Sequence, residues 1–252
     1  MKILTLARDL RRRKARERKG LFVAEGLRTV EELLRSPVHV NSALIGPQLL
    51  ESARGTQLLA VLSDRGVATE EVDAAEFDSA AETDSPQGVL AIGVAPAPTL
   101  DEVPFPERAR FLILDAVQDP GNVGTIIRTA AAFGVSATIS LPGTVDLWNA
   151  KVVRSAMGAH FHHPSLSSTW DELDTFRRDR SIAIWAAEAS GDAIDGLERP
   201  SRLALVVGNE GGGLSPQSRE RADRLVSLPI AATVDSLNVA VAAGILLYEL
   251  RR

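Results

Sequence analysis

The sequence predicts an α/β protein of two units, the second built around a parallel sheet. Continuous apolar runs such as residues 111–114 recur through the C-terminal half, as strands buried on both faces do, and helical patterns separate them. Four of the 13 prolines fall between Pro96 and Pro106, where the chain can neither continue a helix nor enter a sheet. We therefore expect a first domain at residues 1–95, a linker at 96–107 and a second domain at 108–252.

In the first domain, helical and strand patterns alternate. Leu27, Val30 and Leu34 share one face of a helix that should end before Pro37. The remaining pattern predicts a strand, a helix and another strand, at residues 39–45, 57–64 and 89–94.

In the second domain, strands are predicted at residues 111–114, 137–141, 182–186, 203–207 and 225–228. Helices are predicted between them and at the end, at residues 123–133, 148–157, 172–178, 216–222 and 242–248. This alternation is typical of a doubly wound sheet, which binds ligands at the carboxyl ends of its strands.

Composition excludes several classes of protein. The 252 residues are 45% hydrophobic and 24% charged, which is typical of a globular protein. There is no cysteine, so disulfides, thiolate nucleophiles and the usual zinc sites are excluded. The N-terminal apolar run is too short for a signal peptide and no window approaches a membrane span, so a cytoplasmic protein is expected.

The net charge of −5 conceals an asymmetry. Residues 1–35 carry eleven Lys or Arg against five Asp or Glu, whereas residues 70–84 carry seven acids and no base. Such a split can orient a polyanion towards one face, although the basic run at residues 11–19 also fits a solvated helix face.

The first functional loop follows the strand at 111–114. Pro120 begins a turn, and Asn122 is placed to cap the next helix. Arg128 lies nearly two turns further on, beside apolar residues such as Ile127, where an idle guanidinium would be costly to desolvate. We expect Arg128 to grip a phosphate, with a helix cap and a surface salt bridge as the alternative.

The second loop, residues 206–215, follows another buried strand. Gly208 and the later glycines allow the backbone to approach a ligand closely. The spacing is not G-x-G-x-x-G, and Glu210 would repel a pyrophosphate, so a dinucleotide is rejected. A carboxylate suits a cofactor without phosphate that bears a cationic centre, such as S-adenosylmethionine.

The third loop, residues 228–240, precedes the final helix. Asp235 or Ser236 is expected to cap that helix, and Asn238 provides an amide near the mouth of the fold. By itself this loop indicates only a capped helix.

Together, and in this order, the loops resemble the three signature motifs of the SpoU (TrmH) family of RNA ribose 2′-O-methyltransferases, over about residues 110–252. Residues 19–26 and 85–90 resemble the family's substrate-binding domain, whose RNA-binding fold is like that of ribosomal protein L30e. The resemblance implies an S-adenosylmethionine-dependent enzyme that methylates a ribose 2′-hydroxyl, with 23S ribosomal RNA as the expected substrate. It also implies a SPOUT-type catalytic domain with a trefoil knot, and a homodimer with the active site near the subunit interface.

The resemblance assigns two sets of residues. The first is implied to contact the cofactor: Val207, Gly208, Leu228, Ile230 and Leu237. The second falls on motif positions associated with catalysis or RNA: Asn122, Arg128, Glu210, Ser236 and Asn238. Departures from the family pattern at Leu228, Ile230 and Ala240 remove no polar group assigned to the reaction.

Methyl transfer is an in-line displacement that needs aligned reactants and loss of the hydroxyl proton. Because a free guanidinium stays protonated, we expect Arg128 to bind the adjacent phosphate and stabilise charge on the 2′-oxygen instead of acting as the base. No metal is expected, since His160, His162 and His163 lack the i, i+4 spacing of a helical zinc pair.

Three alternatives share parts of this pattern. A knotted methyltransferase that acts on a base should lack the pair Asn122 and Arg128. A transfer-RNA ribose methyltransferase would share every motif, and only the first domain favours ribosomal RNA. A catalytically inactive RNA-binding protein should have lost Arg128 or the glycine loop, and this sequence keeps both.

Overall fold

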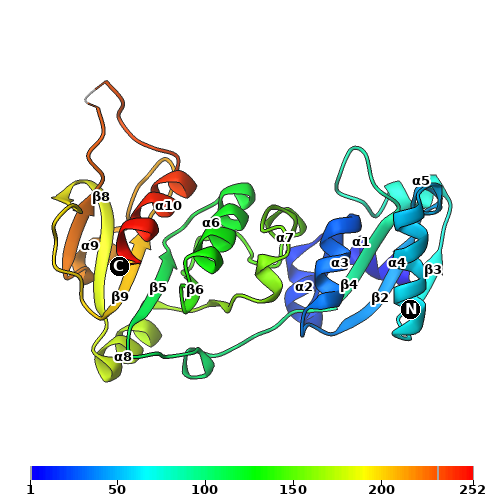
Figure 1. The fold of residues 1–252 in the computed structure, drawn as a ribbon, viewed down its shortest axis with the longest axis horizontal. Helices are drawn as coiled ribbons and strands as arrows, with labels where there is room; N and C mark the ends of the chain where they lie inside the picture. Colours follow the sequence, from blue (N-terminus) through cyan, green and yellow to red (C-terminus); the bar gives the residue numbers. More distant parts are fainter. Residues whose placement is uncertain (1, 232, 252) are drawn as a thin grey trace. The chain divides into compact units, whose positions relative to one another are not determined.

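The computed structural model describes residues 2–231 and 233–251, and the chain forms two compact units (Figure 1). Unit 1 contains the described residues up to Pro96 together with Trp148–His162. Unit 2 contains Ala97–Leu147 and the described residues from His163 onward. The chain therefore leaves unit 2, contributes a segment to unit 1 and returns.

Unit 1 is built on a four-stranded sheet of order β1-β4-β2-β3. Strand β4 runs antiparallel to both of its neighbours, and β2 and β3 are parallel. Its elements are α1 (Ile3–Leu10), α2 (Arg13–Lys19), β1 (Leu21–Glu25), α3 (Leu27–Arg35), β2 (Val40–Ile45), η1 (Pro47–Glu51), α4 (Ala53–Asp64), β3 (Ala68–Glu71), α5 (Ala74–Asp78), β4 (Val89–Val94), α7 (Ala150–Ser155) and η3 (Ala159–Phe161).

The predicted elements of unit 1 are confirmed at β2, α3, α4 and β4, and α3 ends at Arg35, just before Pro37. The sequence missed β1, which is short and lies between helices, and it missed α1. Helix α1 buries Leu6, Ala7 and Leu10 against the sheet, so the basic N-terminal segment is anchored by an apolar face.

The segment 148–162 was expected in the catalytic domain as a helix over residues 148–157, but it packs in unit 1. The ring of Phe22 on β1 lies 4.5 Å from that of Trp148 and 5.8 Å from that of Phe161. Val153 on α7 belongs to the same buried cluster. These apolar side chains find their partners on the sheet of unit 1, a choice that helical periodicity does not reveal.

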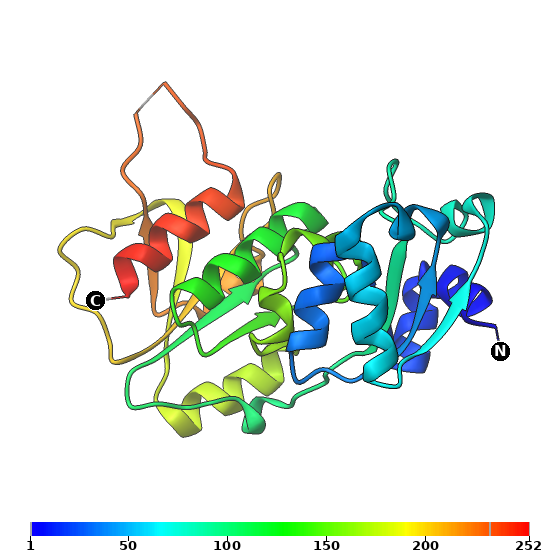
Figure 2. The same ribbon diagram turned by 45° about the vertical axis from the view of Figure 1, so that its right-hand side comes forward.

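Unit 2 is built on a six-stranded sheet of order β10-β8-β9-β5-β6-β7, in which every pair of neighbours is parallel (Figure 2). The predicted parallel sheet is therefore confirmed. Its elements are η2 (Leu100–Glu102), β5 (Ala109–Leu114), α6 (Pro120–Ala132), β6 (Ala137–Ser140), β7 (Ser165–Ser167), α8 (Trp170–Arg180), β8 (Ala183–Ala193), β9 (Arg202–Val207), α9 (Pro216–Arg221), β10 (Arg224–Ser227) and α10 (Val239–Leu250).

The proline-rich segment is packed against unit 2. The ring of Phe105 lies 6.1 Å from that of Phe111 on β5 and 6.3 Å from that of Phe176 on α8. The guanidinium of Arg202 lies 5.0 Å from the centre of the Phe105 ring. These contacts attach residues 97–107 to the core of unit 2.

His163 has structural surroundings. His163 is buried, and its Nε2 lies 2.8 Å from Thr138 Oγ1. Burial lowers the pKa of His163 to about 4, so its ring is neutral at pH 7.

Across residues 2–231 and 233–251 no group of three or more metal-ligating side chains is placed to hold an ion. No helix within the same ranges is long and apolar enough to cross a membrane.

Candidate functional site

The loops that follow β9 and β10, together with residues 187–189 within β8, line one cavity of about 560 Å³ in unit 2. Loops that follow strands are where a parallel sheet is expected to bind ligands. All the residues predicted to contact the cofactor line it: Val207, Gly208, Leu228, Ile230 and Leu237. Glu210, Ser236 and Asn238 also line this cavity, so the structure brings together the second and third loops.

The glycine loop after β9 is closed by its own backbone. The amide of Asn209 donates to the carbonyl of Gly213 at 2.9 Å, and the amide of Gly213 donates back at 2.9 Å. Asn209 Oδ1 accepts from the amides of Gly211 and Gly212 at 2.9 and 2.8 Å. Because a Cβ atom at position 208 would overlap the backbone of Gly213, the loop requires glycine there.

A chain of hydrogen bonds links the three loops. Asn122 Nδ2 donates to Glu210 Oε1 at 3.0 Å, and Asn238 Nδ2 donates to Asn122 Oδ1 at 3.0 Å. Asn238 Oδ1 in turn accepts from the amides of Ala240 and Val241 at the start of α10. We call Glu210, Asn122 and Asn238 the amide chain, and it joins polar groups of all three motifs beside the cavity.

The Glu210 carboxylate is the acceptor at the start of this chain. Burial alone would raise its pKa, but hydrogen bonds from the Asn122 amide, from its own backbone amide and from the amides of Gln118 and Asp119 together lower it. Glu210 is therefore ionised at neutral pH, with donors directed at both oxygens. This arrangement suits a residue that positions the loops better than one that removes a proton.

The predicted helix caps were wrong at both helices. Asp119, not Asn122, caps α6 by accepting from the Asn122 amide at 2.8 Å. Asn238 caps α10 in place of Asp235 or Ser236. In each case the sequence allowed several capping residues within a few positions, and only the backbone decides which side-chain oxygen reaches the free amides.

Arg128 does not lie in the cavity. Its side chain is exposed on α6, and no hydrogen bond or ion pair joins it to the described part of the chain. The expectation of a desolvated guanidinium was wrong, because the helix buries Val123, Ile127 and Ala130 and turns position 128 towards solvent. Arg128 is thus available to a ligand outside its own chain.

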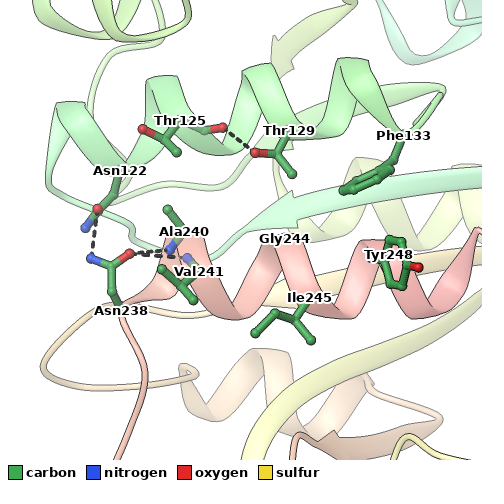
Figure 3. Close-up of a pocket in the computed structure, with 10 residues that line it drawn as sticks. All are labelled: Asn122, Thr125, Thr129, Phe133, Asn238, Ala240, Val241, Gly244, Ile245 and Tyr248. Carbon is green, nitrogen blue, oxygen red and sulfur yellow. Dashed lines mark hydrogen bonds between the residues drawn. The ribbon is translucent and has the colours of Figure 1, made fainter.

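A second, apolar groove lies between α6 and α10 (Figure 3). Asn122 and Asn238 stand at one end of it, and the exposed side chains of Val241, Ile245 and Tyr248 follow along α10. Sequence reasoning noted small residues in this helix but missed the groove. Apolar residues at positions 241, 245 and 248 recur at helical spacing. This pattern indicates an exposed apolar stripe only once the opposite face of α10 is known to be buried.

Asp115, at the end of β5, is a second residue that sequence reasoning did not single out. It is buried, and its Oδ2 accepts from the Ser215 amide at 2.6 Å and from Ser218 Oγ at 2.5 Å. These bonds fix the start of α9 beside β5. An aspartate directly after an apolar strand was the available signal.

Comparisons with known proteins agree with this geometry. Residues 109–248 match the model of the SpoU rRNA Methylase family, and residues 3–91 match that of the MRM3-like substrate binding domain. A 23S rRNA (guanosine(2553)-2′-O)-methyltransferase of Bacillus subtilis is 35% identical over 97% of this chain and 94% of its own length. A 23S rRNA (uridine(2479)-2′-O)-methyltransferase of Streptomyces viridochromogenes is 30% identical over 94% of this chain and 84% of its own length.

Solved structures show the same similarity along the whole chain. The AdoMet-bound rRNA methyltransferase of Sinorhizobium meliloti has a TM-score of 0.86 and 31% identity, covering 99% of this chain and 94% of that one. The SpoU methyltransferase AviRb of Streptomyces viridochromogenes, in complex with AdoMet, has a TM-score of 0.87 and 29% identity, covering 98% and 96%.

The glycine loop generates a prediction. Gly208→Ala should weaken binding of S-adenosylhomocysteine by at least about tenfold and lower the melting temperature, because the added methyl group displaces the backbone of Gly213. Gly212→Ala is the matched control, since Gly212 does not line the cavity and a Cβ there would meet only Asn209 Oδ1, at 3.6 Å. Calorimetry and thermal melting measure both effects. Equal affinities in the two variants would mean that the closed loop does not form the binding site.

Proposed function

Because the chain belongs to the SpoU rRNA Methylase family, we propose that it methylates a ribose 2′-hydroxyl of 23S ribosomal RNA with S-adenosylmethionine as methyl donor. The observation that carries the proposal is the amide chain, which joins the three loops at the mouth of the cavity. The relatives named as 23S rRNA 2′-O-methyltransferases cover nearly the whole of this chain. The proposed substrate makes the cytoplasm the proposed site of action.

The cavity is chemically suited to the cofactor. Its walls contain apolar side chains such as Leu228 and Leu246, which suit a nucleobase, and the carboxylate of Glu210. The described residues that line it include no cluster of basic side chains that would bind a phosphate. When bound, S-adenosylmethionine supplies an electrophilic methyl group on a cationic sulfur. We propose that Val207, Gly208, Leu228, Ile230 and Leu237 hold it.

The reacting end of the cavity is assigned to the amide chain. Asn122, Glu210, Ser236 and Asn238 are proposed to orient the target nucleotide, with Glu210 holding the loops in register through its ionised carboxylate. Arg128 is proposed to bind the neighbouring phosphate and to stabilise negative charge on the 2′-oxygen as its proton leaves. Its exposure and its lack of an ionic partner in the described residues support this role.

Unit 1 is proposed to bind RNA. Its match to a substrate-binding domain covers residues 3–91, and helix α2 with the residues before it exposes several cations: Arg11, Arg12, Arg13, Lys14 and Arg18. Asp9 and Glu17 neutralise only part of this charge. Phosphate contacts from such a surface supply affinity without sequence preference. We also propose that unit 1 has the ribosomal protein L30e fold and that unit 2 contains the trefoil knot of SPOUT methyltransferases.

We further propose that the groove between α6 and α10 is covered by a second copy of this chain. Val241, Ile245 and Tyr248 are 49%, 42% and 45% exposed, an apolar stripe that is costly to leave in water. Asn238 lines both this groove and the cavity, and Asn122, which lines the groove, is bonded to Asn238, so a second copy seated here would lie next to the site. Arg128, exposed on the same helix α6, would then face the active site of a partner.

The activity itself gives the first test. Wild-type protein should transfer labelled methyl groups from S-adenosylmethionine to unmodified 23S rRNA fragments. Alkaline hydrolysis of the product should leave one phosphodiester bond uncleaved, next to the methylated ribose. Transfer RNA is the matched substrate for the nearest alternative, and we expect no transfer to it. Methylation of transfer RNA alone would identify transfer RNA as the substrate in place of 23S rRNA. Binding of RNA without any methylation would indicate a catalytically inactive RNA-binding protein.

Arg128 gives the second test. Arg128→Ala should leave affinity for S-adenosylhomocysteine unchanged but slow single-turnover transfer on saturating RNA by at least about 100-fold, since one charge contact in the transition state is lost. Arg128→Lys should restore little, because an ammonium lacks the planar bidentate fork. Arg178→Ala, at an exposed arginine of α8, is the control. A wild-type rate in Arg128→Ala would remove this residue from the mechanism.

The groove gives the third test. Ile245→Asp places a charge in the proposed interface, so the protein should sediment as a monomer, whereas the wild type should sediment as a dimer. Val61→Asp, at a 41% exposed position on α4, is the control and should remain dimeric. A monomeric wild type would contradict the proposed assembly.

A further inference from the structure

The cavity wall contains a charged group that none of the three loops supplies. Strand β8 pairs with β10 at Trp185 and Ala186, and the pairing then jumps to Asp192. The backbone between these positions bulges out of the ladder, and residues 187–189 of the bulge line the cavity. Glu188 is the charged residue among these three.

Glu188 is held by an arginine on the neighbouring helix. Arg219 Nε, on α9, lies 3.0 Å from Glu188 Oε1 and 2.9 Å from Oε2. The hydrogen bond to Glu188 and the negative charge of that carboxylate raise the pKa of Arg219 above its ordinary value. Both side chains line the cavity, with exposed fractions of 22% for Glu188 and 42% for Arg219.

This carboxylate has acceptor capacity that the protein leaves open. Two carboxylate oxygens offer about four lone-pair sites, and the single N–H at Arg219 Nε occupies only part of them. No other hydrogen bond to Glu188 is found in residues 2–231 and 233–251. An exposed ion pair contributes little to folding, so stability alone gives weak reason for a bulge that carries Glu188 into the cavity.

The groups of the cofactor suggest what Glu188 binds. The amide chain marks the end where the methyl group must meet the RNA, and the apolar wall suits the adenine. In S-adenosylmethionine the ribose lies between the adenine and the sulfur, and a carboxylate is a common acceptor for ribose hydroxyls. Arg219 offsets the cost of a second carboxylate in a cavity that already contains Glu210.

Resting on the proposed function, we propose that Glu188 accepts hydrogen bonds from the ribose hydroxyls of the bound cofactor. Arg219 is the positioning residue that holds this carboxylate against the cavity. The pair therefore selects a ribonucleoside, and it acts on cofactor affinity without touching the RNA.

Calorimetry with non-reacting probes tests this assignment. Glu188→Ala should weaken binding of S-adenosylhomocysteine by about tenfold or more, the scale of losing a hydrogen bond to a charged group. It should weaken 5′-methylthioadenosine by a similar factor, because that compound keeps the ribose and lacks the amino-acid tail. Glu220→Ala, at the exposed residue next to Arg219, is the matched control and should bind both probes normally.

A deoxyribose probe separates a direct contact from an indirect one. Wild-type protein should bind 2′-deoxy-S-adenosylhomocysteine about tenfold more weakly than the ribose form, whereas Glu188→Ala should bind the two alike. Arg219→Ala should keep part of this discrimination, since Glu188 remains. Thermal melting establishes that each variant is folded.

Three outcomes would overturn the assignment. If Glu188→Ala binds S-adenosylhomocysteine with wild-type affinity, the ion pair is a surface contact with no part in cofactor binding. The proposed methyltransferase activity would stand unchanged. Weakened binding of S-adenosylhomocysteine with unchanged binding of 5′-methylthioadenosine would assign the pair to the amino-acid end of the cofactor. Failure of the wild type to bind any probe would reject the proposed function together with this inference.

Discussion

The arrangement of unit 2 depends on one chain of hydrogen bonds, from Glu210 through Asn122 to Asn238. Its direction follows from the ionised carboxylate at one end. Since Glu210 can only accept, the Asn122 amide nitrogen must donate to it, and the oxygen of Asn122 is then left to accept from Asn238. The oxygen of Asn238 is left for the amides of α10. Each amide therefore has one orientation, and the three loops, which are remote in sequence, are held in one fixed arrangement.

Two further contacts support this register. The carboxylate of Asp115 fixes the start of α9, and the side chain of Asn209 shapes the glycine loop while its Nδ2 donates to the carbonyl of Ala116 at 2.8 Å. Ala116 has a φ of 56°, an uncommon value for a residue with a side chain. The strain at Ala116 is thus held by a hydrogen bond from the loop that closes the cavity, which ties the first motif to the second.

The two units are connected by more than a single linker. The chain passes between them at Pro96, again before Trp148 and once more after His162. Trp148 and Phe161 pack on Phe22, so removal of residues 1–95 would leave two aromatic rings without their partner. The proposed RNA binding by unit 1 is therefore better separated from the proposed methyl transfer by surface substitutions than by truncation.

Sequence patterns predicted the parallel sheet, because buried strands leave local, periodic signals. The resemblance to the SpoU motifs, and not periodicity, implied the residues Val207, Gly208, Leu228, Ile230 and Leu237 that line the cavity. Local patterns could not decide which of Asp119 and Asn122 caps α6, whether Arg128 is buried, or where Trp148 packs. Each of these depends on contacts between residues distant in sequence, and such contacts exist only once the sheets and helices have assembled. Glu188 shows the same limit, since its proposed role follows from a break in strand pairing that only the tertiary structure creates.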